Sequence, residues 1–285
     1  MSVKNSFFLK KQTLNCRGKL LIIQKPLVMG ILNLTPDSFY DGGKYQTKEE
    51  ILNRVQQMVD EGVALIDIGG MSSRPGADII DEQEELARVV PAITLISENF
   101  PDLILSIDTV RSAVAEASLK AGAHLINDIS AGEIDNRIFE VAARYHAPYI
   151  LMHMQGNPQT MQMNPKYDNV VNDVMEFFTS KAKKLKEHGV VDVILDAGIG
   201  FGKNLEHNFE LLSRLDDYQI FQLPILVGIS RKSIVNSVLK TKPENALNGS
   251  TVLHSVALLK GANILRVHDI RAATESVALT ERFLK

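Results

Sequence analysis

The chain carries polar and charged side chains at regular intervals, and two sets of them have the chemistry to bind a small molecule. The first set can donate hydrogen bonds to an anion, above all a phosphate, and consists of Arg74, Lys232, Arg266 and His268. The second set combines acceptors and donors and consists of Asp108, Asn127, Asp196 and Lys232. Such a set suits a flat heterocycle with N–H and carbonyl groups at its edge. Together the two sets predict a site for a phosphate and a heterocyclic ring.

Short apolar segments precede these polar residues, and each segment is followed by an amphipathic stretch. The apolar segments are residues 27–32, 65–68, 103–108, 124–128, 149–153, 193–196, 225–228 and 264–267. They are almost continuously apolar, which is typical of parallel strands buried on both faces. Helical patterns include residues 49–61, 84–99, 112–121, 171–188 and 209–215, with a last helix at 274–284. Eight strands that each precede a helix predict an α/β fold, a (β/α)8 TIM barrel.

A barrel of this kind places its chemistry at the carboxyl ends of the strands, where the polar residues of this chain lie. Competing interpretations stay open for several of them. Thr109 and Ser130 are of the type that caps helix N-termini. Arg266 is also consistent with a solvated charge at the barrel rim, and His153 with a core histidine. A buried aspartate beside a lysine is consistent with a structural ion pair.

The chain is expected to form a single domain. Residues 27–285 would form the barrel and residues 1–26 an N-terminal extension, in which the segments around Arg17 and Gly18 predict a β-hairpin that closes the barrel bottom. A doubly wound open sheet is disfavoured because no glycine-rich dinucleotide fingerprint follows the first strand. Residues 198–203 lack the glycine spacing and the following Ser or Thr of a phosphate-binding loop.

Composition narrows the class of protein further. Hydrophobic residues make up 45% and charged residues 23%, as in soluble globular proteins. The net charge of −3 gives no basis for nucleic acid or an acidic membrane as a partner. Cys16 is the only cysteine, so an intramolecular disulfide is impossible. No stretch approaches the roughly 18 apolar residues of a membrane helix. We therefore expect a cytoplasmic protein that binds small molecules.

A series of short motifs, in their order and spacing, resembles the dihydropteroate synthase family of pterin-binding enzymes. They are residues 29–39 (MGILNLTPDSF), 66–70 (IDIGG), 73–77 (SRPGA), 106–109 (SIDT), 126–129 (INDI), 152–156 (MHMQG), 198–203 (GIGFGK) after Asp196, 230–232 (SRK) and 266–269 (RVHD). The resemblance covers residues 27–284 and implies a transferase of folate biosynthesis. That enzyme would condense 6-hydroxymethyl-7,8-dihydropterin diphosphate with p-aminobenzoate and release pyrophosphate.

The resemblance also implies a role for each candidate residue. The pterin ring would contact Asp108, Asn127, Ile129, Met152, Asp196, Phe201 and Lys232. The diphosphate would contact Asn33, Arg74, Arg266 and His268, with Asn33 as the protein ligand of a Mg²⁺ cofactor. The p-aminobenzoate slot would be formed by Phe39, Ser73, Arg74, Pro75 and Ser233. The residues expected to act in catalysis are Asp108, Lys232, Arg266 and His268.

Asp108 is expected to stabilise positive charge that develops on the pterin and not to act as a nucleophile. The family further implies inhibition by sulfonamides and a homodimer formed through late helices, for which the apolar run at 250–259 is weak support.

This chain departs from the family pattern at two places that touch the proposed loops. Met71 stands where a glutamate is common, with Ser73 in place of a threonine, and Ala197 stands where proline is common. None of these departures removes a predicted ligand-binding group. Two alternatives remain at this point: a barrel that transfers a methyl group from methyltetrahydrofolate to a corrinoid protein, and a catalytically silent pterin-binding protein.

Overall fold

The computed structural model describes residues 12–34, 47–71, 80–156, 161 and 165–284. Within these residues, eight parallel strands close into a barrel in the order β10-β3-β4-β5-β6-β7-β8-β9. The strands are β3 (Leu27–Asn33), β4 (Leu65–Gly69), β5 (Ile104–Asp108), β6 (Leu125–Asp128), β7 (Tyr149–Met152), β8 (Val193–Asp196), β9 (Ile225–Val227) and β10 (Ile264–Val267). The predicted TIM barrel is confirmed.

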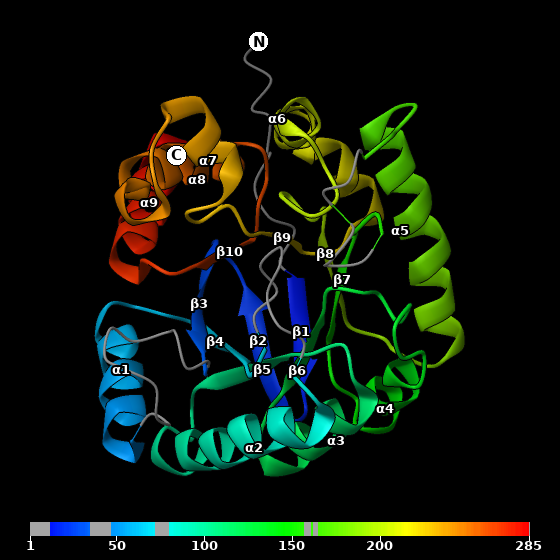
Figure 1. Cartoon of the computed structure of the whole chain (residues 1–285), viewed down its shortest axis with the longest axis vertical. Coiled ribbons are helices and arrows are strands. Elements are labelled where there is room, and N and C mark those ends of the chain that lie inside the picture. Colours follow the sequence, from blue (N-terminus) through cyan, green and yellow to red (C-terminus); the bar gives the residue numbers. More distant parts are fainter. Residues whose placement is uncertain (1–11, 35–46, 72–79, 157–160, 162–164, 285) are drawn as a thin grey trace.

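Helices surround the barrel, and each barrel strand leads into one of them (Figure 1). They are α1 (Lys48–Asp60), α2 (Glu82–Asn99), α3 (Ser112–Ala121), α4 (Ile138–Arg144), α5 (Val170–Glu187), α6 (Leu205–Ser213), α7 (Ser233–Leu239), α8 (Leu247–Leu259) and α9 (Ile270–Leu284), with short 3₁₀ helices η1 (Leu215–Phe221) and η2 (Pro243–Asn245). Among the described helices, none is long and apolar enough to cross a membrane.

Two helices begin four residues before their expected starts, whereas the other predicted helix boundaries agree within two residues. The helix expected at 209–215 begins earlier, at Leu205, because the Asn204 side chain accepts a hydrogen bond from the His207 N–H and forms a capping box there. Helix α6 ends at Ser213, and Leu215, the last residue of the expected helix, begins the separate 3₁₀ helix η1. The last helix likewise begins at Ile270, four residues before the expected start at residue 274.

Alternation along each strand decides which side chains enter the barrel. In β4, Ile66 and Ile68 pack outward in the main hydrophobic core with residues of the helices, whereas Leu65 packs inside the barrel. Asp67 follows Leu65 on the inward face, one level closer to the carboxyl ends of the strands. The barrel register places Asn33 opposite Gly69, Gly69 opposite Asp108, and Asp108 opposite Asn127. These residues therefore lie at one level, although they are distant in sequence.

The amino-terminal end of the barrel is closed by the predicted hairpin. Strands β1 (Gln12–Cys16) and β2 (Lys19–Ile23) pair antiparallel, with Leu14 opposite Leu21. Their buried side chains pack against the innermost residues of the barrel strands, including Met29 and Leu65. Arg17 fastens the turn by donating hydrogen bonds to the carbonyl oxygens of Leu119 and Ala123. Cys16 is fully buried in this layer, and burial raises its thiol pKa to about 12. Water and ligands must therefore reach the barrel interior from the opposite end.

Candidate active site

Arg266 is the centre of a buried polar network at the carboxyl end of the barrel. Its Nε donates to Asp67 Oδ2 and its Nη2 donates to Asp108 Oδ2, both at 2.6 Å. Asn127 Nδ2 donates to the same Asp67 oxygen at 2.8 Å. Burial lowers the pKa of Arg266, but the two carboxylates outweigh that effect and raise it above its usual value. The guanidinium is therefore a fixed positive charge at the bottom of the site.

Asp67 lies at the polar end of the second predicted strand, within the motif at residues 66–70, but no role in the site was predicted for it from the sequence. No local sequence pattern marks its role, because its ion-pair partner Arg266 is brought next to it only when β10 closes the barrel. Its side chain is completely buried, and among the described residues its Oδ1 has no hydrogen-bond partner. A buried carboxylate oxygen normally has a donor, so Oδ1 is available to a water molecule or to a polar ligand group. Its sequence signal is its position on the inward face, two residues before the strand ends.

Asp108 is the last residue of β5 and accepts a hydrogen bond from Arg266. Burial raises the pKa of its carboxyl to about 7, and Arg266 opposes that rise while Asp67 adds to it. The carboxylate is thus kept beside a positive charge in a site of low polarity, where electrostatic interactions are stronger than in water. This is an environment that can stabilise positive charge developing on a bound ligand.

Lys232 and Asp196 provide a donor and an acceptor at the same end of the barrel. The Lys232 ammonium donates to the Ile199 carbonyl at 2.8 Å and lies 4.4 Å from the centroid of the Phe201 ring. Burial lowers its pKa to about 8, and Asp196 opposes that decrease. Burial raises the pKa of Asp196, whereas Lys232 lowers it. Asp196 Oδ1 accepts from the N–H of Gly198, which fixes the carboxylate at the end of β8.

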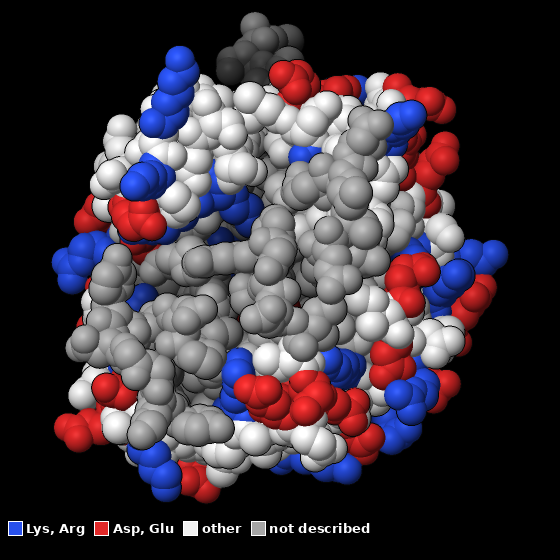
Figure 2. All heavy atoms as spheres, viewed as in Figure 1, with Lys and Arg blue, Asp and Glu red and all other residues white. Residues whose placement is uncertain are grey.

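Gly228 lies next to two basic side chains of the site, Lys232 and Arg266. A Cβ atom at Gly228 would stand 3.6 Å from Lys232 Nζ and 3.9 Å from Arg266 Cβ. Any larger side chain at this position would fill the space beside both groups. Figure 2 shows lysine or arginine atoms deep in a hollow of this face, beside α7.

The apolar residues predicted to contact a ring form one cluster. Ile129, Met152 and Phe201 pack together with Val110 and Met161, each of them buried. The sequence-based prediction named the first three and missed the other two. Met71 and Met154, both partly buried, pack against this cluster. Met71 thus places a thioether where a glutamate is common, and the apolar surface extends toward β4.

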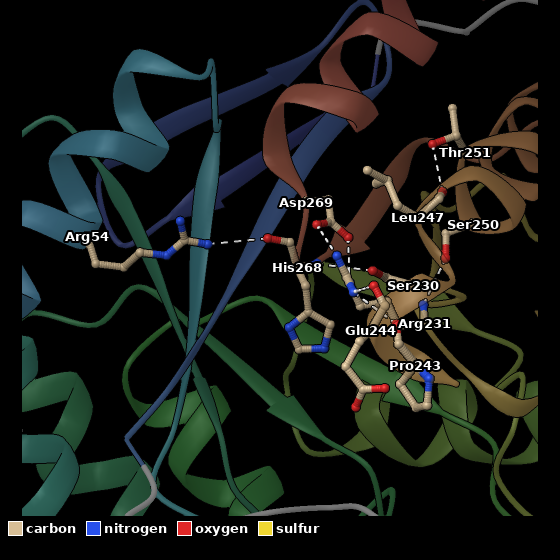
Figure 3. A network of polar contacts seen from close by, with 10 residues as sticks. All are labelled: Arg54, Ser230, Arg231, Pro243, Glu244, Leu247, Ser250, Thr251, His268 and Asp269. Carbon is tan, nitrogen blue, oxygen red and sulfur yellow. Dashed lines mark hydrogen bonds and ion pairs between the residues drawn. The ribbon is translucent and has the colours of Figure 1, made fainter. Parts of the chain in front are cut away.

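An ion pair joins the loops that follow β9 and β10 (Figure 3). Arg231 makes two parallel hydrogen bonds to Asp269, from Nε at 2.8 Å and from Nη2 at 2.7 Å. Its Nη1 donates to the carbonyl oxygens of Pro243 and Glu244 at 2.9 Å. The backbone of Arg231 has a φ of 57°, an unfavourable conformation for a non-glycine residue. These bonds hold that conformation, which orients the neighbouring Lys232.

The same junction fixes His268. Its N–H donates to Ser230 Oγ at 3.2 Å, and its carbonyl oxygen accepts from Arg54 Nη2 at 3.3 Å. Figure 3 shows its imidazole projecting to the side opposite the Asp269 carboxylate. The backbone of His268 is thus held from α1 and from the loop after β9.

The remaining predicted residues fall into two groups. Asn33 ends β3, and its Oδ1 is 3.5 Å from the position that a Cβ of Gly69 would take, next to Asp108. Ser233 is exposed at the first position of α7. Phe39, Ser73, Arg74 and Pro75 lie outside the described residues. Within the described part of the chain, no group of three or more His, Cys, Asp or Glu side chains could hold a metal ion.

Comparison with known proteins identifies the family to which this chain belongs. A sequence model of the family described as pterin binding enzyme matches residues 29–268. The curated dihydropteroate synthase of Escherichia coli K12 is 42% identical over 270 residues, which span 94% of this chain and 95% of that protein. The chain belongs to the dihydropteroate synthase family.

Solved members of the dihydropteroate synthase family share the fold of this chain. A Yersinia pestis dihydropteroate synthase, solved with a sulfonamide drug complex, has a TM-score of 0.91 and 44% identity, covering 95% of this chain and 99% of that chain. The Thermus thermophilus enzyme, solved with 4-aminobenzoate, has a TM-score of 0.85 and 37% identity, covering 95% of this chain and 99% of that chain. These comparisons do not favour a corrinoid-linked methyltransferase or a silent pterin-binding protein.

Proposed function

We propose that the chain is a dihydropteroate synthase that condenses 6-hydroxymethyl-7,8-dihydropterin diphosphate with p-aminobenzoate to give 7,8-dihydropteroate and pyrophosphate. The observation that carries this proposal is that one end of the barrel holds Asp196, Lys232 and the Asp67–Arg266–Asp108 network together, with Gly228 next to both Lys232 and Arg266. Asp196 and Lys232 offer the edge contacts of a pterin, and the Arg266 guanidinium offers N–H donors for a diphosphate. Membership of the family supports the same reaction.

The pterin ring is placed by complementary hydrogen bonds and by apolar contact. The Asp196 carboxylate accepts from the 2-amino group and the N3–H, a charge-assisted pair. Lys232 donates to the ring carbonyl and N5, while Asp108 and Asn127 bind the remaining ring nitrogens. Ile129, Met152 and Phe201 contact the faces of the ring, in keeping with their shared apolar cluster.

The diphosphate is bound by Arg266, His268 and Arg74. A Mg²⁺ ion fits the ligand oxygen that Asn33 provides at the end of β3. Asn33 places one neutral amide oxygen at the level of Asp108. Mg²⁺ takes few protein ligands and keeps water and phosphate oxygens, so one amide oxygen is adequate. When bound, the ion supplies additional positive charge for the diphosphate oxygens. Asn33 would hold it on the protein side.

The p-aminobenzoate slot is assigned to Phe39, Ser73, Arg74, Pro75 and Ser233. Ser233 opens α7 directly after Lys232, so a carboxylate there faces the amino terminus of a helix. The solved relatives bound to a sulfonamide and to 4-aminobenzoate support a slot for an aminoaryl acid in this family.

The reaction needs one bond to break and one to form. The C–O bond between the pterin methylene and the diphosphate breaks, and its electron pair leaves with pyrophosphate. The methylene then forms a C–N bond to the aryl amine, whose N–H bond breaks as its proton passes to the released pyrophosphate or to water. Arg266 and His268 stabilise the leaving group, and Asp108 stabilises the positive charge on the pterin methylene. The aryl amine is already neutral at pH 7, so this chain's residues need to supply orientation and charge and no nucleophile.

A product assay tests the proposal. Purified protein is mixed with Mg²⁺, the dihydropterin diphosphate and p-aminobenzoate, and pyrophosphate and dihydropteroate are quantified together. Equal formation of both products that depends on p-aminobenzoate is expected. Pyrophosphate alone would show that the p-aminobenzoate slot is misassigned, and a folded protein that binds pterin without forming either product would overturn the proposed activity.

Pterin binding should depend on Lys232 and on pH. We expect Lys232→Ala and Asp196→Asn each to weaken pterin binding by about 10–100-fold, because each removes a charge-assisted bond. Lys232 is a charged donor below its pKa of about 8, so wild-type affinity should fall as pH rises through that value. Calorimetry with 6-hydroxymethylpterin measures both effects. In Lys232→Ala the decrease above pH 8 should be smaller than in the wild type, because only ionisation of the pterin N3–H remains; an unchanged pH profile would contradict the assignment.

Sulfonamides should compete with p-aminobenzoate. They mimic the aryl amine and carry an anionic or polar group where p-aminobenzoate carries its carboxylate, so both need one slot. Steady-state kinetics with varied p-aminobenzoate should give an apparent KM that rises with inhibitor concentration at constant maximal rate. Purely noncompetitive inhibition would show that the two molecules bind at different places.

A homodimer is proposed from the apolar surface of the late helices. Exposed apolar side chains gather on α7, α8 and α9, namely Val238, Leu239, Leu247, Val252, Leu259, Leu279 and Phe283. Large exposed apolar surfaces mark interaction sites. Sedimentation equilibrium should give twice the mass of the 31.6 kDa chain, and Val252→Glu should shift the equilibrium toward the monomer. A wild-type monomer at micromolar concentration would refute this assembly.

A further inference from the structure

Lys203 is a buried lysine that the proposed reaction does not use. It lies in the loop between β8 and α6 and is 2% exposed. Its Nζ donates to the carbonyl oxygens of Phe201 at 2.8 Å, Gly198 at 3.0 Å and His153 at 3.2 Å. His153 Nδ1 is a fourth contact of the ammonium, at 3.0 Å. These contacts direct the group toward its own loop and the loop after β7, and not toward an anion.

The two loops that Lys203 joins pack backbone against backbone. Gly198 and Gly202 have φ values of 66° and 63°, in the left-handed region. A Cβ atom at Gly198 would stand 1.9 Å from the His153 carbonyl oxygen, and one at Gly202 would stand 2.5 Å from the Gln155 carbonyl oxygen. Such close approach leaves several carbonyl oxygens buried at one junction, and each needs a donor. The lysine ammonium has three donors and no acceptor, which suits this position.

The same loop supplies two contacts of Lys232. The Ile199 carbonyl accepts from the Lys232 ammonium, and the Phe201 ring lies beneath it. Gly198 and Phe201, whose carbonyls bind Lys203, flank Ile199 on either side. The Gly198 N–H also donates to Asp196. Fixing the loop at Lys203 therefore fixes the surroundings of both groups assigned to the pterin edge.

We propose that Lys203 is a positioning residue for pterin binding, because it holds the loop that places Phe201 and the Ile199 carbonyl against Lys232. This inference rests on the proposed function and assigns it one further residue. Lys203 touches no substrate in this account. Its effect reaches the ring through Phe201 and through the orientation of the Lys232 ammonium.

The electrostatics of the junction agree with this role. Burial and the charge of Lys203 lower the pKa of His153 to about 2, so its imidazole is neutral and Nδ1 can accept. Burial lowers the pKa of Lys203 to about 7, and Asp196 opposes that decrease. Both forms of the lysine donate hydrogen bonds, so the loop keeps donors on either side of neutral pH.

Steady-state kinetics of Lys203→Met test the inference. Methionine keeps the length and apolar stem of lysine and removes the donors. We expect the KM for the dihydropterin diphosphate to rise about tenfold or more, with the KM for p-aminobenzoate within about twofold of wild type. Calorimetric affinity for 6-hydroxymethylpterin should fall by the same factor. Lys186→Met, at an exposed lysine of α5, is the matched control and should change neither constant.

A second variant separates positioning from folding. Lys203→Gln restores two donors on a shorter side chain and should recover part of the lost pterin affinity. Unchanged pterin constants in folded Lys203→Met, or equal changes for both substrates, would overturn the inference. Failure of both variants to fold would do so too, since Lys203 would then be a structural residue. The role of Lys203 in pterin binding is measured by calorimetry and does not require turnover. A wild-type protein that binds 6-hydroxymethylpterin but forms no product would therefore contradict the proposed function and leave the inference about Lys203 to be decided by the affinities of the variants.

Discussion

Replacing Arg266 with methionine is expected to lower kcat/KM by about 10³-fold, the scale seen when a preorganised charge donor is removed. Arg266 binds both Asp67 and Asp108 at 2.6 Å, so the variant also leaves two buried carboxylates without their cation. Breaking a buried ion pair from one side costs about 3–5 kcal/mol of folding stability. Chemical denaturation and single-turnover kinetics measure the two effects separately.

The same variant should discriminate between ligands. Arg266 is assigned to the diphosphate, so affinity for a diphosphate-bearing pterin should fall more than affinity for pteroate. Arg271→Met, at an exposed arginine of α9, is the control for loss of one positive charge. Equal losses for both ligands would place Arg266 at the ring and not at the diphosphate.

Asp67→Asn should produce the second-largest effect. The substitution keeps the shape of the side chain and removes the charge that Arg266 binds through Nε. The remaining amide oxygen can still accept from Asn127 and Arg266 at the Oδ2 position, and the new amino group takes the place of Oδ1, which has no hydrogen-bond partner among the described residues. We expect kcat/KM to fall about 100-fold and the free energy of unfolding to fall by about 2–3 kcal/mol, because the buried guanidinium loses a charged acceptor and keeps only a neutral one.

A residue in register with Asp67 provides the control. Ser106 is its partner on β5, is equally buried, and has a hydroxyl without a hydrogen-bond partner among the described residues. Ser106→Ala should therefore change kcat/KM by less than about twofold and leave the denaturation midpoint nearly unchanged. If Asp67→Asn behaved like Ser106→Ala, the proposed dependence of Arg266 and Asn127 on this carboxylate would be wrong.

The barrel could be predicted from the sequence because each strand is a short, apolar run that a helical pattern follows. The placement of Asp108 and Asn127 at strand ends also followed from the sequence, since a strand's carboxyl end is visible as a change from apolar to polar residues. The structure adds that these ends meet at one level through the register of β3 to β6.

Two features needed three-dimensional information. Asp67 and Arg266 are separated by 199 residues, and only the pairing of β10 with β3 brings them together, so no local pattern could reveal their ion pair. Lys203 lies in a glycine-rich segment, where a lysine suggests an anion, yet its ammonium turns back to carbonyl oxygens. That direction depends on the left-handed glycines and on the neighbouring loop, which the sequence does not specify.

The buried position of Cys16 has a practical consequence for experiments on this protein. It is the only sulfhydryl of the chain, it is fully buried between the hairpin and the barrel strands, and burial holds its pKa near 12. Maleimide dyes and spin labels react with accessible thiolates, so the native fold should be almost silent toward them. A cysteine introduced at an exposed position such as Ser237 would then carry a single probe, without prior removal of the natural one. For the same reason, thiol-specific oxidants should leave the catalytic rate unaffected.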